Sequence, residues 1–254
     1  MTGGGWKYAA ASVIGTSHQG SSEGVCQDSH ACQYLQQSSA FVAVVSDGAG
    51  SASHSQLGSR RTCDYIMERA TDASAETILS RDFAVDVLDG LRQGLQELAD
   101  ASEQQLRDFA CTMLVAVICG NRAAFWQIGD GAMCFRIRDS ETFQYAFWPD
   151  KGEYANETSF VTQANAQQHL EFDLSDCEIV QLAVFSDGLE RLALDFTKGE
   201  PHNGFFNGLF PYLSPFEAGH AVNISSQIAG FLGSERVTRR TDDDKTLILA
   251  ALEL

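Results

Sequence analysis

The sequence Phe41-Val-Ala-Val-Val-Ser-Asp-Gly-Ala-Gly50 joins an apolar run to a carboxylate and two glycines. Its five apolar residues are mostly β-branched or aromatic, which is typical of a buried strand. The glycines predict the end of that strand, because glycine-rich runs break strands and let the backbone approach a ligand closely. The same arrangement recurs at Leu182-Ala-Val-Phe-Ser-Asp-Gly188. We therefore expect Asp47 and Asp187 to meet in space and to hold metal.

The composition is typical of a soluble globular protein, with 44% hydrophobic and 20% charged residues among 254. No linker divides the chain, so we expect a single domain over 1–254 that is a monomer. The net charge of −17 argues against nucleic acid and an anionic membrane as partners. Apolar runs are too short to span a bilayer, and no secretory signal is visible. Seven scattered cysteines without a Cys-x-x-Cys pair also fit a cytoplasmic protein.

The first half of the chain predicts strands and then a pair of helices. Residues 1–6 are expected to form a flexible lead-in. The strands are expected at 8–14, 26–35 and 41–46, and the helices at 55–70 and from residue 81 onward. The second helix is predicted because apolar residues recur at helical spacing from Phe83 to Leu98.

The second half predicts further strands and a late helix. The strands are expected at 110–119, 122–128, 133–138, 143–147, 159–162, 178–186 and 247–252, with a helix starting near 189. Residues 196–213 lack periodicity and are expected to form an irregular insertion. Ser214-Pro-Phe-Glu217 predicts a helix start, with a serine cap, a proline in the first turn and a glutamate three residues after the cap. This order predicts an α+β fold, in which two mainly antiparallel sheets carry helices on their outer faces.

Five aspartates share one context, since each lies at a strand end or beside glycine. They are Asp28, Asp47, Asp130, Asp187 and Asp243. Hard cations such as Mg²⁺ and Mn²⁺ take oxygen ligands from carboxylates, backbone carbonyls and water. A single Asp-Gly pair is equally a common turn signal. The recurrence of Ser-Asp-Gly after two apolar strands favours a metal site.

Five motifs occur in the order seen in metal-dependent type 2C (PPM) Ser/Thr phosphatases. They are Ser46-Asp-Gly-Ala-Gly50, Cys111-Thr-Met-Leu114, Ile128-Gly-Asp-Gly131, Phe185-Ser-Asp-Gly188 and Asp243-Asp-Lys-Thr246. The opening Gly15-Thr-Ser-His18 followed by Cys26-Gln-Asp28 resembles the bacterial-type branch of that family. The resemblance runs from about 8 to 252, nearly the whole chain. It implies a four-layer α-β-β-α sandwich with metals in a cleft at one edge.

The resemblance also implies a set of ligands for Mg²⁺ or Mn²⁺, with two core ions and a weaker third. These ligands are Asp28, Asp47, the Gly48 carbonyl, Asp130, Asp187 and Asp243. Asp47 would bridge the core ions, and Asp187 and Asp243 would complete the shell of one of them. Asp28 would act at the second ion through water, and Asp130 with Asp187 would hold the third. Asp243 is chosen over its acidic neighbours because it stands three residues before Thr246.

The implied reaction is hydrolysis of phosphoserine or phosphothreonine in a protein partner. Two metals about 3.5–4 Å apart lower the pKa of a bridging water, and the resulting hydroxide attacks phosphorus in line. Asp47, Asp187 and Asp243 would be the catalytic carboxylates. Two alternatives remain open at this point. One is a pseudophosphatase that binds a partner without turnover, and the other is a phosphatase for small phosphate esters.

The chain departs from the family pattern around the phosphate. Glu23 stands where the family commonly has a phosphate-holding arginine, and His18 could take over that contact or be an exposed loop residue. Ala49 replaces the histidine that many eukaryotic members have, and Gln27 replaces an acidic residue. Residues 196–213 fall where the family carries a flap. Their aromatic side chains would form a docking surface if exposed and part of the core if buried.

Overall fold

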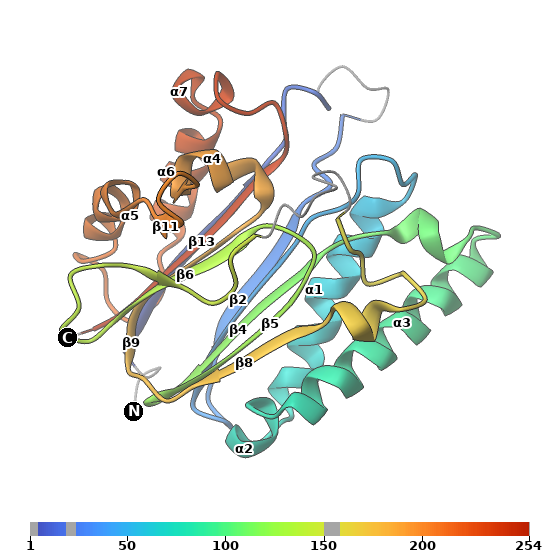
Figure 1. Ribbon diagram of the computed structural model, residues 1–254, viewed down its shortest axis with the longest axis horizontal. Coiled ribbons are helices and arrows are strands. Elements are labelled where there is room, and N and C mark those ends of the chain that lie inside the picture. Colours follow the sequence, from blue (N-terminus) through green and yellow to red (C-terminus); the bar gives the residue numbers. More distant parts are fainter. Residues whose placement is uncertain (1–4, 19–23, 150–157, 254) are drawn as a thin grey trace.

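The computed structural model describes residues 5–18, 24–149 and 158–253 of the chain. Two sheets pack face to face, and helices cover the outer face of each one (Figure 1). This is the α+β sandwich that the sequence predicts. None of the helices in the described part of the chain combines the length and apolar character that a membrane span requires.

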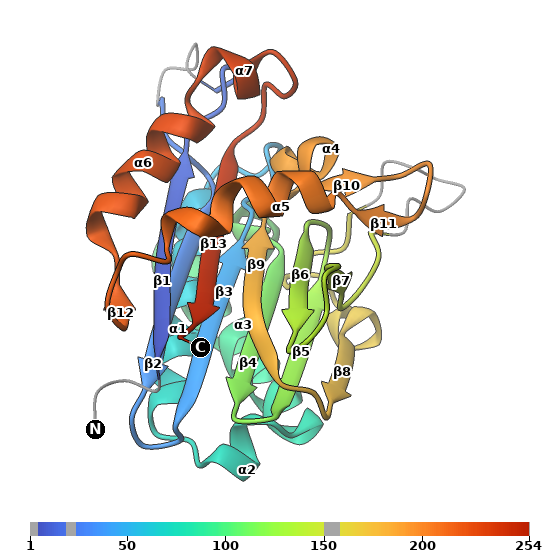
Figure 2. The same cartoon turned by 90° about the vertical axis from the view of Figure 1, so that its left-hand side faces the viewer.

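The first sheet has the strand order β12-β1-β13-β9-β6-β7. Its strands are β1 (Trp6–Val13), β6 (Ala132–Ile137), β7 (Gln144–Tyr145), β9 (Ile179–Phe185), β12 (Gly219–His220) and β13 (Lys245–Leu252). All neighbours in this sheet are antiparallel except β1 and β12. The helices α5 and α6 lie across its outer face (Figure 2).

The second sheet has the order β2-β3-β4-β5-β8 and is antiparallel throughout. Its strands are β2 (Ser29–Leu35), β3 (Ala40–Ser46), β4 (Met113–Cys119), β5 (Arg122–Ile128) and β8 (Glu171–Ser175). The interior strand β3, between β2 and β4, is buried along its whole length. Val42 and Val44 contact the helix layer, whereas Phe41 and Val45 face the other sheet. Because both faces of β3 are covered, its sequence is continuously apolar rather than alternating.

Two long helices cover the second sheet, as the apolar spacing predicts. They are α1 (Ser55–Thr71) and α3 (Arg81–Ala101), joined through the short α2 (Ala75–Ile78). The Phe83 amide donates to Ser80 Oγ at 3.1 Å and caps the start of α3. The stripe from Phe83 through Leu95 is buried against the sheet.

The first sheet carries shorter helices. They are α4 (Glu190–Ala193), α5 (Asn203–Leu209), α6 (Val222–Leu232) and α7 (Glu235–Thr238), with the 3-10 turns η3 (Asp187–Leu189) and η4 (Phe210–Tyr212). Two further 3-10 turns, η1 (Leu106–Phe109) and η2 (Ala166–His169), and the hairpin β10 (Leu194–Asp195) with β11 (Glu200–Pro201) complete the described elements. All seven cysteines are free thiols.

Two predictions for the first sheet are wrong. Trp6 is not part of a flexible lead-in, because it begins β1 and stacks on Phe41 at a ring distance of 5.0 Å. The helix predicted from Ser214 begins at Val222 instead. The intervening Gly219 and His220 pair with β1 in parallel, and Gly219 has a φ of +127°, which a helix does not allow. Pairing with a neighbouring strand thus overrides a local capping pattern.

Two further predictions need correction. Residues 196–213 are not irregular, since they contain α5 and η4, and Phe206 and Phe210 pack in the core. Their aromatic side chains are therefore largely core, while Tyr212 is exposed. Residues 159–162 form no strand, although the Val161 amide donates to the Cys111 carbonyl at 3.0 Å.

Candidate active site

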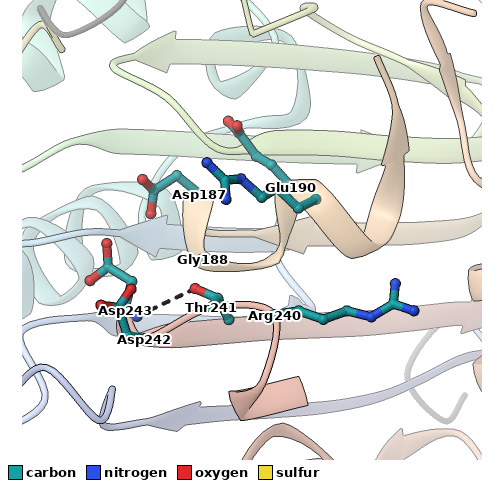
Figure 3. Close-up of a pocket in the computed structure, with 8 residues that line it drawn as sticks. Asp187, Gly188, Glu190, Arg240, Thr241, Asp242 and Asp243 are labelled. Atoms are coloured by element: carbon teal, nitrogen blue, oxygen red, sulfur yellow. Dashed lines mark hydrogen bonds between the residues drawn. The ribbon is translucent and has the colours of Figure 1, made fainter. Parts of the chain in front are cut away.

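Strands β3 and β9 end in Ser-Asp-Gly at one cleft of about 370 Å³. The cleft is lined by Ser17, His18, Asp47, Gly48, Ala49, Gly50, Thr112, Asp130, Thr158, Phe160, Asp187, Asp242 and Asp243. The predicted meeting of Asp47 and Asp187 is therefore observed. A smaller pocket adjoins the cleft, and there Asp187 and Asp243 project to the same side while Arg240 points away from them (Figure 3).

Asp47 is held by a reciprocal contact with Thr112. The Asp47 amide donates to Thr112 Oγ1 at 2.9 Å, and the Thr112 amide donates to the Asp47 carbonyl at 2.8 Å. Ser46 Oγ adds a donation to the Thr112 carbonyl at 2.6 Å. The serine and the threonine of the two motifs therefore fix the end of β3.

Gly48 is required by close packing. A Cβ on this residue would lie 2.7 Å from the Gln27 carbonyl oxygen and 2.9 Å from Ser55. No larger residue fits without moving the backbone. The glycine thus brings the end of β3 next to the segment that carries Asp28.

Asp28 is buried, with 5% exposure, and is not among the residues that line the cleft. Ser186 Oγ donates to Asp28 Oδ2 at 2.7 Å and accepts from the Thr246 amide at 3.0 Å. The second oxygen of Asp28 is buried without a hydrogen-bond partner, as is Oδ1 of Asp187. Buried carboxylate oxygens are normally satisfied, so these two oxygens are suited to accept a cation.

The carboxylates raise one another's pKa values. Burial, followed by the charges of Asp28 and Asp187, raises the pKa of Asp47 well above its usual range. Burial raises the pKa of Asp28 to about 6. Burial, together with Asp130 and Asp243, raises the pKa of Asp187 to about 7. These groups cannot all ionise at neutral pH without a compensating cation.

The donor set fits a hard divalent cation. All its atoms are oxygens, and two of them are buried without partners. Within residues 5–18, 24–149 and 158–253, no three His, Cys, Asp or Glu side chains enclose an ion by themselves. Water and the Gly48 carbonyl would therefore complete a coordination shell, in keeping with the several waters that Mg²⁺ usually retains.

Asp130 sits in the turn between β5 and β6. The flanking Gly129 and Gly131 have φ values of +98° and +92°, which favour glycine. Thr158 Oγ1 donates to Asp130 Oδ2 at 2.8 Å. The Gly131 amide donates to Glu190 Oε1 at 3.1 Å. The turn thus holds Asp130 at the cleft next to Asp187.

The three neighbouring aspartates near the C-terminus have different positions. Asp242 and Asp243 line the cleft. Asp244 is 2% exposed, and its carboxylate accepts the amides of Gly15 and Gln27 at 2.6 Å each. Asp244 is thus occupied with backbone, while both Asp242 and Asp243 are available to the cleft.

His18 lines the cleft and is not a freely exposed loop residue. Its Nδ1 lies 3.1 Å from Asp244 Oδ1, and the side chain is 25% exposed. Glu23, at the family's arginine position, lies outside the described residues. His54 precedes α1 and stacks on Phe109 at 5.3 Å, so it is not part of the cleft lining.

Three residues that hold the site in place were not predicted from the sequence. Thr112 lies inside a quoted motif, so its position carried a signal. Asp244 lies in an acidic run whose members the sequence could not orient. Thr158 follows a polar stretch of sequence without any recognisable pattern, and only the fold brings it to Asp130.

With this geometry in view, comparison with known proteins is decisive. The family model described as Protein phosphatase 2C matches residues 14–233. The chain belongs to the protein phosphatase 2C family. Over 252 residues it is 35% identical to serine/threonine-protein phosphatase 3 of Escherichia coli K12, a match that covers 96% of this chain and 98% of that protein.

Solved structures of this family share the fold. The S. agalactiae serine/threonine phosphatase has a TM-score of 0.68 and 15% identity, covering 98% of this chain and 100% of that one. RsbX in complex with magnesium has a TM-score of 0.58 and 15% identity, covering 97% and 94% of the two chains. The predicted family and the predicted sandwich are both confirmed.

Proposed function

We propose that this chain is a phosphoprotein phosphatase that hydrolyses phosphoserine and phosphothreonine with the help of Mg²⁺ or Mn²⁺. Family membership and the similarity to an E. coli serine/threonine phosphatase support the reaction class. The observation that carries the proposal is the group of partly buried carboxylates at two Ser-Asp-Gly strand ends, Asp47 and Asp187, together with the buried Asp28. Their raised pKa values indicate a site built for cations.

The proposed ligands are the residues expected from the sequence. Asp47 would bridge two core ions, with the Gly48 carbonyl on one of them and Asp187 and Asp243 on the other. Asp28 would act through water, and the remaining predicted ligand, Asp130, would share a third, weaker ion with Asp187. When bound, such ions lower the pKa of a coordinated water and offset charge on the phosphoryl oxygens. The magnesium complex of RsbX supports this choice of ion.

The chain's own residues supply orientation. Thr112 fixes the backbone of Asp47, and Ser186 fixes Asp28 at one oxygen. His18 faces the same cleft and would contact the substrate's phosphate. The open cleft suits a phosphorylated side chain on a protein surface. We further propose that the enzyme works as a monomer in the cytoplasm and binds neither nucleic acid nor membrane, in keeping with its net charge of −17.

The test is hydrolysis of an aryl phosphate with and without Mn²⁺, comparing wild type with Asp47→Asn and Asp187→Asn. We expect cation-dependent turnover in wild type and a loss of at least about 100-fold in each variant. Absence of turnover in wild type would support a partner-binding pseudophosphatase instead. Unchanged turnover in both variants would refute the assigned site. A phosphoserine peptide compared with small phosphate esters then tests the substrate class.

A further inference from the structure

We propose that His18 donates the proton to the leaving oxygen of the substrate, and that Asp244 is the positioning residue that turns His18 toward the cleft. This inference rests on the proposed function and deepens it, because it assigns the group that completes cleavage of the phosphate ester. It goes beyond a simple phosphate contact by His18.

Asp244 joins three segments that are distant in sequence. Its two oxygens accept the amides of Gly15 and Gln27 at 2.6 Å each, and Oδ1 also lies 3.1 Å from His18 Nδ1. The side chain is almost fully buried, so these contacts are shielded from bulk water. A carboxylate this close to one imidazole nitrogen favours the ring orientation in which that nitrogen faces it.

The backbone around His18 is also held by contacts that do not involve that carboxylate. Ser17 donates to the Asp242 carbonyl twice, from its amide at 2.9 Å and from Oγ at 2.7 Å. The His18 amide donates to the Gly15 carbonyl at 3.2 Å and closes a tight turn. A Cβ on Gly15 would lie 2.3 Å from the Asp242 carbonyl oxygen, so only glycine allows this approach.

The other ring nitrogen lies on the side of the cleft. His18 Nε2 is 3.8 Å from the position that a Cβ on Gly50 would occupy, and Gly50 lines the cleft together with Asp47 and Asp187. His18 is the only histidine lining the cleft among the described residues. One nitrogen thus faces a buried carboxylate, and the other lies near Gly50 in the cleft that Asp47 and Asp187 also line.

The chemistry requires such a donor. When the bond from phosphorus to the serine or threonine oxygen breaks, its electron pair stays on a strongly basic alkoxide. Proton transfer from His18 Nε2 neutralises that oxygen as the water oxygen forms its new bond to phosphorus. One proton of the water is released to solvent, and solvent returns a proton to the imidazole. General-acid catalysis of this kind contributes about 10²–10⁴-fold.

The experiment compares substrates whose leaving groups differ in basicity, using His18→Gln and wild type with Mn²⁺. We expect His18→Gln to lower kcat for a phosphoserine peptide and for phenyl phosphate by about 10²-fold or more. With 2,4-dinitrophenyl phosphate, whose leaving group needs no proton, we expect a loss at least about tenfold smaller than with phenyl phosphate. Added imidazole is expected to restore part of the activity of His18→Ala toward phenyl phosphate.

Asp244→Asn is expected to lower kcat with the same dependence on leaving group, but by a smaller factor. His169→Gln, which changes an exposed histidine outside the cleft, is expected to leave kcat unchanged. An equal loss on all substrates, or no loss on any, would overturn the proton-donor role. Failure of wild type to hydrolyse 2,4-dinitrophenyl phosphate would instead contradict the proposed function. A lowered melting temperature would show that a variant is misfolded. Weaker inhibition by inorganic phosphate would show that a phosphate contact is lost, which is distinct from the loss of proton transfer. If Asp244→Asn does not fold, the His18 variants still decide the proposal.

Discussion

Replacing Asp187 by asparagine is expected to abolish activity and yet to stabilise the cation-free protein. The pKa of Asp187 rises from 3.8 to about 7, because burial and the neighbouring carboxylates disfavour its charge. One pKa unit corresponds to about 1.4 kcal/mol, so the full shift corresponds to about 4 kcal/mol. We take roughly half, about 2 kcal/mol, because Asp187 is partly exposed and shares the repulsion with its neighbours. For a chain of this size that predicts a rise in Tm of about 4–8 °C.

The pH dependence of this effect follows from the direction of the shift. Because the pKa of Asp187 is raised in the folded state, the free energy of unfolding is unaffected below about pH 4, where the carboxyl is protonated in both states. It falls as the pH rises through about 7, where Asp187 must ionise in the folded protein. The Tm difference between Asp187→Asn and wild type should therefore be near zero at pH 4 and largest above pH 7. Saturating Mn²⁺ should raise the Tm of wild type more than that of the variant.

The assay is thermal unfolding followed by circular dichroism in a chelator across that pH range. Asp86→Asn, at an exposed carboxylate on α3, is the matched control and should leave Tm unchanged. If Asp187→Asn lowers Tm equally at every pH, Asp187 is a structural hydrogen-bond acceptor. In that case the reasoning about mutual repulsion is wrong.

Three further predictions concern the architecture around the cleft. Gly15→Ala should lower the free energy of unfolding in urea by about 1–3 kcal/mol, because its Cβ would overlap Asp242, whereas Gly230→Ala, with open space around it, should not lower it. Equal losses in the two variants would contradict the packing argument. Phe206→Ala should lower the free energy of unfolding by about 3–5 kcal/mol, because the ring is fully buried beside Phe143 and Phe185, whereas replacing the exposed Tyr212 by alanine should change it little. A small loss for Phe206→Ala would place this segment outside the core. Thr158→Val removes the hydroxyl that donates to Asp130 and should raise the cation concentration needed for half-maximal activity by about 10-fold. An unchanged concentration would exclude Asp130 from the cation site.

The parts of the fold that the sequence predicts are those where local pattern and burial agree. The run before Asp47 is apolar at every position because β3 is covered on both faces. The stripe of α3 has one buried face, so its spacing is clear. The repeated Ser-Asp-Gly also indicated which two strand ends meet, because its serine and glycine are needed for contacts at those ends.

The errors occur where distant contacts outweigh local pattern. The capping sequence at Ser214 is overridden because Gly219 and His220 pair with β1. Strand β8 was missed because it is a short strand at the sheet edge, and its exposed residues mix acidic side chains with Leu174. The three adjacent aspartates at 242–244 have equal chemistry in sequence, and only the folded loop decides that Asp244 binds backbone amides.

We propose that the carboxylates around Asp47 bind the divalent cations on which phosphoprotein hydrolysis by this chain depends. The most direct measurement is release of inorganic phosphate from a phosphoserine peptide by wild type and Asp47→Asn, each with Mn²⁺ and with excess chelator. We predict rapid release by wild type with Mn²⁺ only, and a loss of at least about 100-fold in the variant. Equal release with and without chelator, or by wild type and variant alike, would contradict the claim.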